Sequence, residues 1–184
     1  MRVIAGTARS LPLKTVPGAS TRPTTDKIKE TLFNILAPQI PGAVFLDLFS
    51  GSGSIGIEAL SRGASKCVFV ENDAKAAACI ADNLRFTKLE ENAVIMRKNV
   101  LSAINELALR GLSFDIVYVD PPYFEGLEEE TLRSLASSGL LNEDSLVIIE
   151  ASKENPLDFI ETLGFRLTRE KQYKTNKHCF LRVK

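Results

Sequence analysis

The chain of 184 residues has few of the side chains that most often bind metal ions. It contains one histidine and three cysteines, and the cysteines form no CxxC pair. Cys67 and Cys79 are far along the chain from the other two candidate ligands, His178 and Cys179. Because a zinc site needs a cluster of such ligands, we expect no metal and three reduced, partly buried thiols. We interpret His178 as a strand or surface residue rather than as a catalytic base.

Long apolar runs are also missing from the sequence. No run reaches the roughly 18 residues that a membrane-spanning helix needs. The first ten residues carry arginines but lack the apolar segment of a secretory signal. No internal repeat or low-complexity tract is evident, and the composition of 45% hydrophobic and 25% charged residues is that of a folded domain. We therefore expect a cytoplasmic protein that does not contact a membrane. No feature of the sequence fixes the oligomeric state, and we take a monomer as the default.

The formal net charge of zero conceals an asymmetry along the chain. Residues 1–25 carry four basic side chains and no acidic one, and residues 164–184 carry seven basic side chains and one acidic one. The two ends therefore have net charges of +4 and +6, which leaves −10 for the residues between them. A polyanion would be attracted to the ends and repelled by much of the middle. Solvated charged faces explain the same pattern, so charge alone does not decide between the two interpretations.

The N-terminal segment differs in composition from the remainder. Residues 1–24 are rich in glycine, proline, serine and threonine, and we interpret them as an arm with a short possible strand over residues 2–5. Thr24 or Thr25 is suited to cap a helix that continues to about residue 36. Residues 25–184 are then expected to form a single domain.

From residue 43 onward, apolar runs alternate with amphipathic segments. The apolar runs predict strands over residues 43–49, 67–71, 93–96, 114–119 and 146–150. The segments that follow them predict helices over residues 55–61, 74–86, 101–109, 127–137 and 156–163. Two last strands, over residues 165–173 and 178–183, are separated by a polar turn and predict an antiparallel hairpin.

Strands that alternate with helices indicate parallel pairing through right-handed crossovers. We therefore predict an α/β fold with a doubly wound, seven-stranded sheet, mostly parallel, with helices on both faces and the hairpin at its C-terminal end. Ligands of such sheets bind at the carboxyl ends of the strands, near the switch in strand order. The chemistry is expected after residues 49, 70, 96 and 119.

The first predicted strand leads into a glycine-rich loop. Gly51, Gly53 and Gly56 allow a sharp turn and a close approach to a ligand, and the free N–H groups of the following helix point at that ligand. Glu71 follows Gly51 by twenty residues, at the end of the second strand, where a carboxylate can accept both ribose hydroxyls of a nucleoside. The pattern also fits a nicotinamide site. Asp47, beside the glycines, suits a cationic ligand better than a pyrophosphate.

The fourth predicted strand ends in Asp120-Pro121-Pro122-Tyr123. The two prolines stiffen the backbone, and the carboxylate of Asp120 and the carbonyl of Pro121 are two acceptors that can hold both hydrogens of an NH₂ group. Tyr123 can stack on the base that carries this amine, a contact worth roughly 1–3 kcal/mol. The pattern favours transfer of a group to an exocyclic base nitrogen over a rigid loop in which Asp120 merely caps a helix.

With both loops in place, the chain resembles the bacterial small-subunit ribosomal RNA guanine-N2 methyltransferases of the RsmD type. The resemblance covers nearly the whole chain, in residues 2–6, 22–26, 30–34, 47–53, 58–64 and 120–123. The glycine loop and the Pro-Pro loop occur in many amino-group methyltransferases. The segment Arg-Pro-Thr-Thr-Asp over residues 22–26 is what singles out this family.

The resemblance implies a Rossmann-like class I methyltransferase domain, S-adenosylmethionine as methyl donor and a guanine of 16S RNA as acceptor, in naked RNA or in a protein-bound assembly intermediate. It implies cofactor contacts from Asp47, Gly51, Gly53, Gly56, Glu71, Asn72 and Asn99. It places the amine at Asp120, Pro121, Pro122 and Tyr123. It implies RNA contacts near the substrate entrance from Arg2, Arg9, Arg22, Thr24 and Asp26.

Three other functions share parts of these patterns. An adenine-N6 methyltransferase of RNA or DNA would use the same Pro-Pro loop on another base. A nucleic-acid-binding module could keep the fold with a vestigial cofactor pocket. A nicotinamide-dependent reductase would use the glycine loop, but the chain lacks a substrate domain of the usual dehydrogenase size. The identity of the methylated nucleoside separates the first from the guanine enzyme, and binding of S-adenosylmethionine rather than NAD(P)H separates the last.

Overall fold

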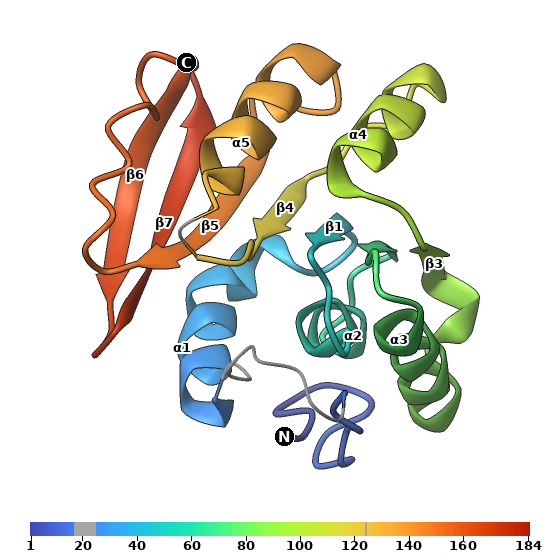
Figure 1. Ribbon diagram of the computed structural model, residues 1–184. Helices are drawn as coiled ribbons and strands as arrows, with labels where there is room; N and C mark the ends of the chain where they lie inside the picture. Colours follow the sequence, from blue (N-terminus) through green and yellow to red (C-terminus); the bar gives the residue numbers. More distant parts are fainter. Residues whose placement is uncertain (17–24, 124) are drawn as a thin grey trace. The chain divides into compact units, whose positions relative to one another are not determined.

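The computed structural model describes residues 1–16, 25–123 and 125–184 (Figure 1). Its seven strands form one sheet in the order β3-β2-β1-β4-β5-β7-β6, which confirms the predicted α/β class. The chain divides into two compact units, residues 1–98 and residues 99–184. The predicted division into an arm, residues 1–24, and a domain, residues 25–184, stays a prediction.

The first unit contains the three strands that precede the middle of the chain. Its elements are α1 (Asp26–Leu36), the short 3-10 helix η1 (Ala37–Gln39), β1 (Val44–Leu48), α2 (Ser54–Ser61), β2 (Lys66–Val70), α3 (Ala74–Thr87), the 3-10 helix η2 (Glu90–Asn92) and β3 (Ala93–Met96). β1 pairs in parallel with β2, and β2 pairs in parallel with β3. The glycine loop lies between β1 and α2, at the carboxyl end of β1.

The second unit contains the Pro-Pro loop and the C-terminal hairpin. Its elements are α4 (Val100–Leu109), β4 (Ile116–Val119), α5 (Leu127–Ser138), β5 (Leu146–Ser152), β6 (Phe165–Gln172) and β7 (Asn176–Val183). β4 and β5 are parallel, and β7 pairs antiparallel with both β5 and β6. The pairing of β6 with β7 is the predicted hairpin. All residues of β4 and β5 are buried, as expected of strands that read as continuous apolar runs.

Side-chain caps explain where several helices begin. Thr25 accepts a hydrogen bond from the backbone N–H of Ile28 and so caps α1. Asp73 accepts from the N–H of Ala76 at the start of α3. A cap of this kind contributes about 1 kcal/mol, because it satisfies an N–H group that the helix leaves without an internal partner. Among the residues that the structure describes, no helix is both long and apolar enough to cross a membrane.

Two predicted elements are wrong. Residues 156–163 form a series of turns instead of a helix, and Leu157 has a left-handed φ of +56° that an α-helix does not accommodate. Leu157 and Ile160 are buried, so turns satisfy the three-residue apolar spacing that resembled a helix face. The possible strand over residues 2–5 is reduced to a single isolated bridge between Arg2 and Pro12.

A buried ion pair between α1 and α2 holds the first residues of the chain in place. Lys29 and Glu58 are fully buried, and their charged groups lie 3.5 Å apart. Glu58 accepts hydrogen bonds from the backbone N–H groups of Ile4 (2.8 Å) and Ala5 (3.0 Å), and Lys29 donates to the carbonyl of Arg2 (2.6 Å). Because a buried pair is tolerated only when its remaining bonds are satisfied, the path of residues 2–5 is tied to this pair.

All three cysteines are free thiols and are buried, as the sequence predicts. Burial raises the pKa of each thiol, so they are held in the neutral form. We therefore assign the three thiols no catalytic role.

Candidate active site

The glycine loop contains three left-handed positions, at alternate residues. Phe49, Gly51 and Gly53 have φ values of +61°, +56° and +77°. The hydroxyl of Ser50 donates to the carbonyl of Asp47 at 2.6 Å, and the N–H of Gly53 donates to the carbonyl of Ser50 at 2.7 Å. A Cβ atom placed on Gly51 would meet nothing within 4 Å. The backbone at Gly51 is therefore open to a ligand, and the hydrogen bonds within the loop fix its conformation.

Glu71 joins this loop to the segment that follows β2. Its Oε2 accepts from the N–H of Gly51 at 2.8 Å, and its Oε1 accepts from the N–H of Asp73 at 2.8 Å. The carboxylate is thus oriented at the carboxyl ends of β1 and β2, where the sequence predicts a ribose acceptor. Each oxygen keeps one further acceptor position for a hydroxyl group.

Asp47 lies beneath the loop and is only 1% exposed. Its Oδ2 accepts from the N–H of Gly56 at 3.0 Å, so the carboxylate braces the first turn of α2. Burial, opposed by this one hydrogen bond, raises the pKa of Asp47 to about 7. A carboxyl group poised in this way gains negative charge when a cation approaches, because an opposite charge favours the ionised form.

The other two glycines allow close packing beneath the loop. A Cβ atom at Gly56 would lie 2.3 Å from the ring of Phe69 and 2.6 Å from the sulfur of Cys67. A Cβ atom at Gly53 would lie 3.1 Å from the side chain of Ile80. Both glycines therefore allow α2 to pack closely against its neighbours. Their contact with a cofactor stays a prediction.

The two predicted asparagines are exposed. Asn72 follows Glu71, and Asn99 begins the second unit. The side-chain oxygen of Asn99 accepts from the N–H of Leu101 at 2.9 Å and caps α4. A helix-capping role therefore accounts for Asn99, and its contact with an adenine amine stays a prediction.

In the second unit, the Pro-Pro loop begins directly after β4. Pro121 is buried, Pro122 is exposed, and Asp120 and Tyr123 are half-buried. The next helix, α5, has Gly126 as its N-cap residue, so Asp120 does not cap it. The interpretation of Asp120 as a helix cap is therefore excluded.

Tyr123 is anchored to a buried carboxylate that the sequence analysis missed. The Tyr123 hydroxyl donates to Oε1 of Glu150, at 3.0 Å, and Glu150 is 6% exposed. Glu150 also accepts from the Tyr118 hydroxyl (2.6 Å) and the Asn176 amide (2.6 Å), and His178 Nε2 lies 3.0 Å from it. The signal in the sequence was an acid and a histidine within apolar strands. From the sequence, we interpret His178 as a strand or surface residue. It lies on strand β7 and is fully buried.

Hydrogen bonding decides the ionisation of this cluster. Burial would raise the pKa of Glu150, but hydrogen bonds with His178, Tyr118 and Tyr123 outweigh it and bring the pKa below its ordinary value. Burial, together with the negative charges of Glu150 and Asp120, raises the pKa of Tyr123. Tyr123 is therefore a neutral hydrogen-bond donor to a carboxylate.

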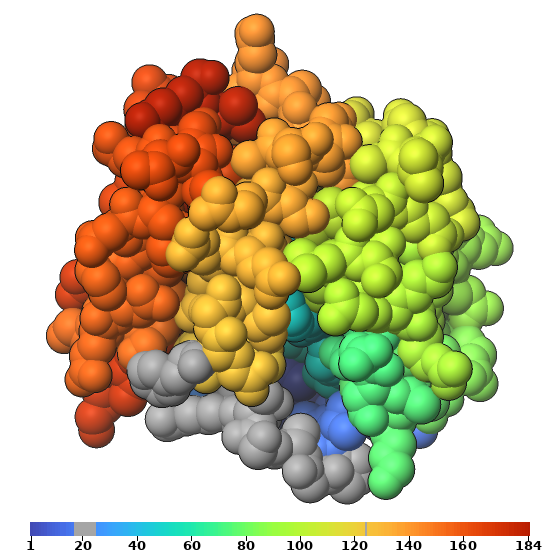
Figure 2. Space-filling view, turned by 45° about the horizontal axis from the view of Figure 1, so that its top comes forward, coloured from blue at the N-terminus to red at the C-terminus, as the bar shows by residue number. Residues whose placement is uncertain are grey.

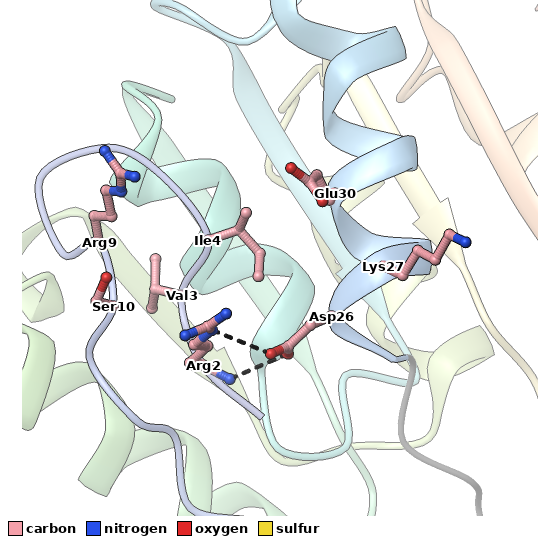
Figure 3. Close-up of a pocket in the computed structure, with 8 residues that line it drawn as sticks. All are labelled: Arg2, Val3, Ile4, Arg9, Ser10, Asp26, Lys27 and Glu30. Atoms are coloured by element: carbon pink, nitrogen blue, oxygen red, sulfur yellow. Dashed lines mark hydrogen bonds and ion pairs between the residues drawn. The ribbon is translucent and has the colours of Figure 1, made fainter.

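Three of the predicted RNA contacts, Arg2, Arg9 and Asp26, line a separate pocket of about 530 Å³ (Figure 3). Arg2 forms an ion pair with Asp26 at 3.3 Å, so these two predicted contacts largely neutralise one another. Arg9 is exposed at the same pocket. Arg22 and Thr24 lie outside the described residues. No residue of the glycine loop lines this pocket.

Comparison with known proteins identifies the family. A family model described as conserved hypothetical protein 95 matches residues 1–182. Ribosomal RNA small subunit methyltransferase D of Escherichia coli K12 is 41% identical over 173 residues, which are 93% of this chain and 84% of that protein. The solved structure of yhhF from Escherichia coli, assigned as a methyltransferase, has a TM-score of 0.85 at 37% identity and covers all of this chain and 97% of that one.

A more distant structure shares the fold alone. It is assigned as a methyltransferase, was solved in complex with SAH, and has a TM-score of 0.70 at 17% identity over 84% of this chain and 49% of that one. Together with the glycine loop, Glu71 and the Pro-Pro loop, the comparisons place the chain without ambiguity. It belongs to the conserved hypothetical protein 95 family, and within that family to the methyltransferases of the RsmD type.

Proposed function

We propose that the protein transfers a methyl group from S-adenosylmethionine to the exocyclic N2 amine of a guanine in small-subunit ribosomal RNA. The observation that carries the proposal is the Asp120–Tyr123 loop, which begins directly after β4 and has its aromatic ring anchored by a buried carboxylate. The 41% identity to ribosomal RNA small subunit methyltransferase D supports the choice of substrate.

The residues of the first unit fit the proposed donor. S-adenosylmethionine, when bound, supplies an electrophilic methyl group on a positively charged sulfur. Gly51 leaves the backbone open, Glu71 keeps acceptor positions for ribose hydroxyls, and α2 begins without a side-chain cap. The buried carboxyl group of Asp47, with its pKa of about 7, favours a cationic ligand over a phosphate. The SAH that is bound to the distant structural relative is consistent with this assignment.

The residues of the second unit orient the acceptor. The carboxylate of Asp120 and the carbonyl of Pro121 accept the two hydrogens of the amine and so turn the nitrogen lone pair toward the methyl group. The ring of Tyr123 stacks on the base and fixes its plane. Orientation of this kind lowers the barrier by about 7–11 kcal/mol at most, which is why a poorly nucleophilic aromatic amine can react. A base within a duplex would have to be flipped out to reach the loop.

A row of cations on the edge strand β6 is suited to the RNA backbone. Arg166, Arg169 and Lys171 are exposed, and a register shift between Leu167 and Arg169 interrupts the pairing with β7. Their partners on β7 are every second residue: Arg182, Phe180 and His178. Because alternate residues of a strand share a face, the bulge brings the three cations to one face of the sheet. The surface of the hairpin is seen in orange and red in Figure 2.

These cations make the proposed binding dependent on salt. Each phosphate contact that is lost makes the negative slope of log K against log salt concentration shallower by about 0.7–0.9. Arg166→Ala, Arg169→Ala and Lys171→Ala together are expected to make it shallower by about 2–3. Arg133→Ala is a matched control, because Arg133 is paired with Glu129 on α5. An unchanged slope in the triple variant would remove β6 from the RNA interface.

The experiment that tests the proposed function identifies the methylated nucleoside. The protein is incubated with tritiated S-adenosylmethionine and with small-subunit RNA from cells that lack the enzyme, both naked and partly assembled. The RNA is then digested and its nucleosides are separated. Label in N2-methylguanosine is the expected result. Label in N6-methyladenosine would overturn the choice of base, and absence of label from all RNA and DNA offered would overturn the proposed activity.

A further inference from the structure

A buried carboxylate links the Pro-Pro loop to the rigid sheet of the second unit. Glu150 follows Ile149, whose partner on β4 is Val119, the last strand residue before Asp120. Of the four side chains bonded to Glu150, only Tyr123 comes from the loop; the others come from β4 and β7. The loop is therefore tied through one hydroxyl to a group that the strands hold in place.

A carboxylate inside the sheet needs a full set of hydrogen-bonding partners. An apolar residue would fit the buried interior of β5, whereas an ionised carboxylate taken from water costs several kcal/mol unless it is fully hydrogen-bonded. Glu150 meets this condition, because two hydrogen-bonding groups approach each of its oxygens. His178 is itself held, since the Tyr173 hydroxyl lies 3.3 Å from its Nδ1. The partners thus form a connected network with a single carboxylate at its centre.

We propose that Glu150 is a positioning residue that sets the ring of Tyr123 for the base. With its hydroxyl directed to Glu150, Tyr123 offers the base its aromatic face and makes no hydroxyl contact with it. The inference rests on the proposed function, because it concerns the base that the loop receives. His178 supports Glu150 and makes no contact with the substrate.

The composition of the chain provides a direct readout of this network. The chain has three tyrosines, one histidine and no tryptophan, and all four aromatic polar side chains belong to the network. Tyrosine fluorescence therefore reports on the network alone. A phenol that donates to a carboxylate fluoresces weakly, because its proton moves toward the carboxylate in the excited state. Glu150→Gln is expected to increase the emission, and adding Tyr123→Phe is expected to remove part of that increase.

The test compares Tyr123→Phe, Glu150→Gln and the double variant in single-turnover methyl transfer. Misplacement of the base by up to about 1 Å lowers the rate between about tenfold and 100-fold, so each single variant is expected in this range. The affinity for S-adenosylmethionine should stay at the wild-type value. Because Glu150 acts through Tyr123, the double variant should be no slower than the slower single variant.

Leu135→Ala is a control for stability, since it truncates a buried side chain of α5 in the same unit and leaves every hydrogen-bonding partner of Glu150 unchanged. It should lower the stability of the protein and leave the transfer rate and the tyrosine emission unchanged. Tyr123→Phe keeps the half-buried ring and removes only the hydroxyl, so it tests the link even if Glu150→Gln does not fold.

Three results would overturn the inference. Rate losses that multiply in the double variant would mean that Glu150 does not act through Tyr123. Wild-type rates in both single variants would reduce the network to a structural role. An emission that Glu150→Gln leaves unchanged would mean that the hydroxyl contact is absent, whatever the activity. Failure of the proposed function is seen separately, as a wild-type protein that transfers no methyl group to RNA.

Discussion

Two buried carboxylates near the carboxyl ends of strands respond to burial in opposite ways. Asp47, in β1, accepts a hydrogen bond from the backbone N–H of Gly56, and burial raises its pKa to about 7. Glu150, in β5, is bonded by four side chains, and its pKa is lowered. Burial raises both pKa values, but at Glu150 the hydrogen bonds and the electrostatic attraction of His178 outweigh it, whereas at Asp47 a single hydrogen bond does not. Asp47 can change its charge near neutral pH, whereas Glu150 is ionised there.

The two loops above these carboxylates are built by opposite means. The glycine loop is shaped by left-handed positions and leaves its backbone open at Gly51. The Pro-Pro loop is stiffened by Pro121 and Pro122 and is tied to Glu150 through Tyr123. We infer that an open backbone with a responsive carboxyl group suits a cationic cofactor, and that a stiff loop with a fixed anion suits the orientation of a base.

The largest expected effect is on stability and comes from Asp47. Because its pKa is raised in the folded protein, the stability it contributes is fully present below about pH 4 and is lost as the pH rises to about 7. The shift corresponds to at most about 4 kcal/mol. Asp47→Asn removes the titration and should flatten the free energy of unfolding between pH 4 and pH 7 in urea titrations.

In the same urea titrations, Glu150 is expected to affect the pH dependence of stability in the opposite direction. Its lowered pKa means that its stability is present above its ordinary pKa of 4.5 and is lost as the pH falls further. Glu150→Gln should therefore change the pH dependence only on the acid side. If Asp47→Asn kept the wild-type slope between pH 4 and pH 7, the contrast between the two carboxylates would be lost.

A smaller effect is expected on cofactor affinity. Glu71→Ala removes a carboxylate acceptor of ribose hydroxyls, and each hydrogen bond to a charged group is worth about 1.5–3 kcal/mol. The dissociation constant of S-adenosylmethionine should rise about tenfold to 100-fold in calorimetry. Glu91→Gln, at an exposed position in the same unit, is the control and should bind as the wild type does. Wild-type affinity in Glu71→Ala would remove Glu71 from the cofactor site.

The smallest effect separates the glycines by their roles. Gly56→Ala forces a Cβ atom against Phe69 and Cys67, and overpacking of this kind destabilises by about 1–3 kcal/mol. Gly51→Ala meets no neighbour but keeps a left-handed φ, which costs roughly 1–2 kcal/mol. The discriminating observation is cofactor affinity at a temperature where both variants are folded. It should fall for Gly51→Ala more than for Gly56→Ala, and the reverse order would contradict the assignment of Gly51 as the open position.

The strands of the sheet could be predicted because buried parallel strands appear in the sequence as short apolar runs with clear ends. Residues 93–96 were predicted with the bounds that β3 has in the structure, and the other strands differ by only a few residues. The helix over residues 156–163 was wrong because apolar spacing records which residues are buried and carries no information about the left-handed φ of Leu157. Backbone conformation of that kind is set by the surrounding structure.

Only part of the candidate site could be predicted from the sequence. The glycine loop and the Pro-Pro loop are short local segments, so their chemistry can be read from neighbouring residues. The network around Glu150 joins side chains from residues 118, 123, 150, 176 and 178, which only strand pairing brings together. None of these residues carries a functional signal by itself in the sequence, and therefore His178 was interpreted without its partner Glu150.

The most direct test of the account measures cofactor affinity and transfer rate together for Asp120→Ala and Glu71→Ala. Asp120→Ala should bind S-adenosylmethionine as the wild type does and transfer methyl groups about 100-fold to 1000-fold more slowly, the loss typical of one positioned hydrogen-bonding group at a reacting centre. Glu71→Ala should bind the cofactor weakly and, at saturating cofactor, recover most of the wild-type rate. If Asp120→Ala lost cofactor affinity as well, or kept the wild-type rate, the assignment of the donor to one loop and the amine to the other would be contradicted.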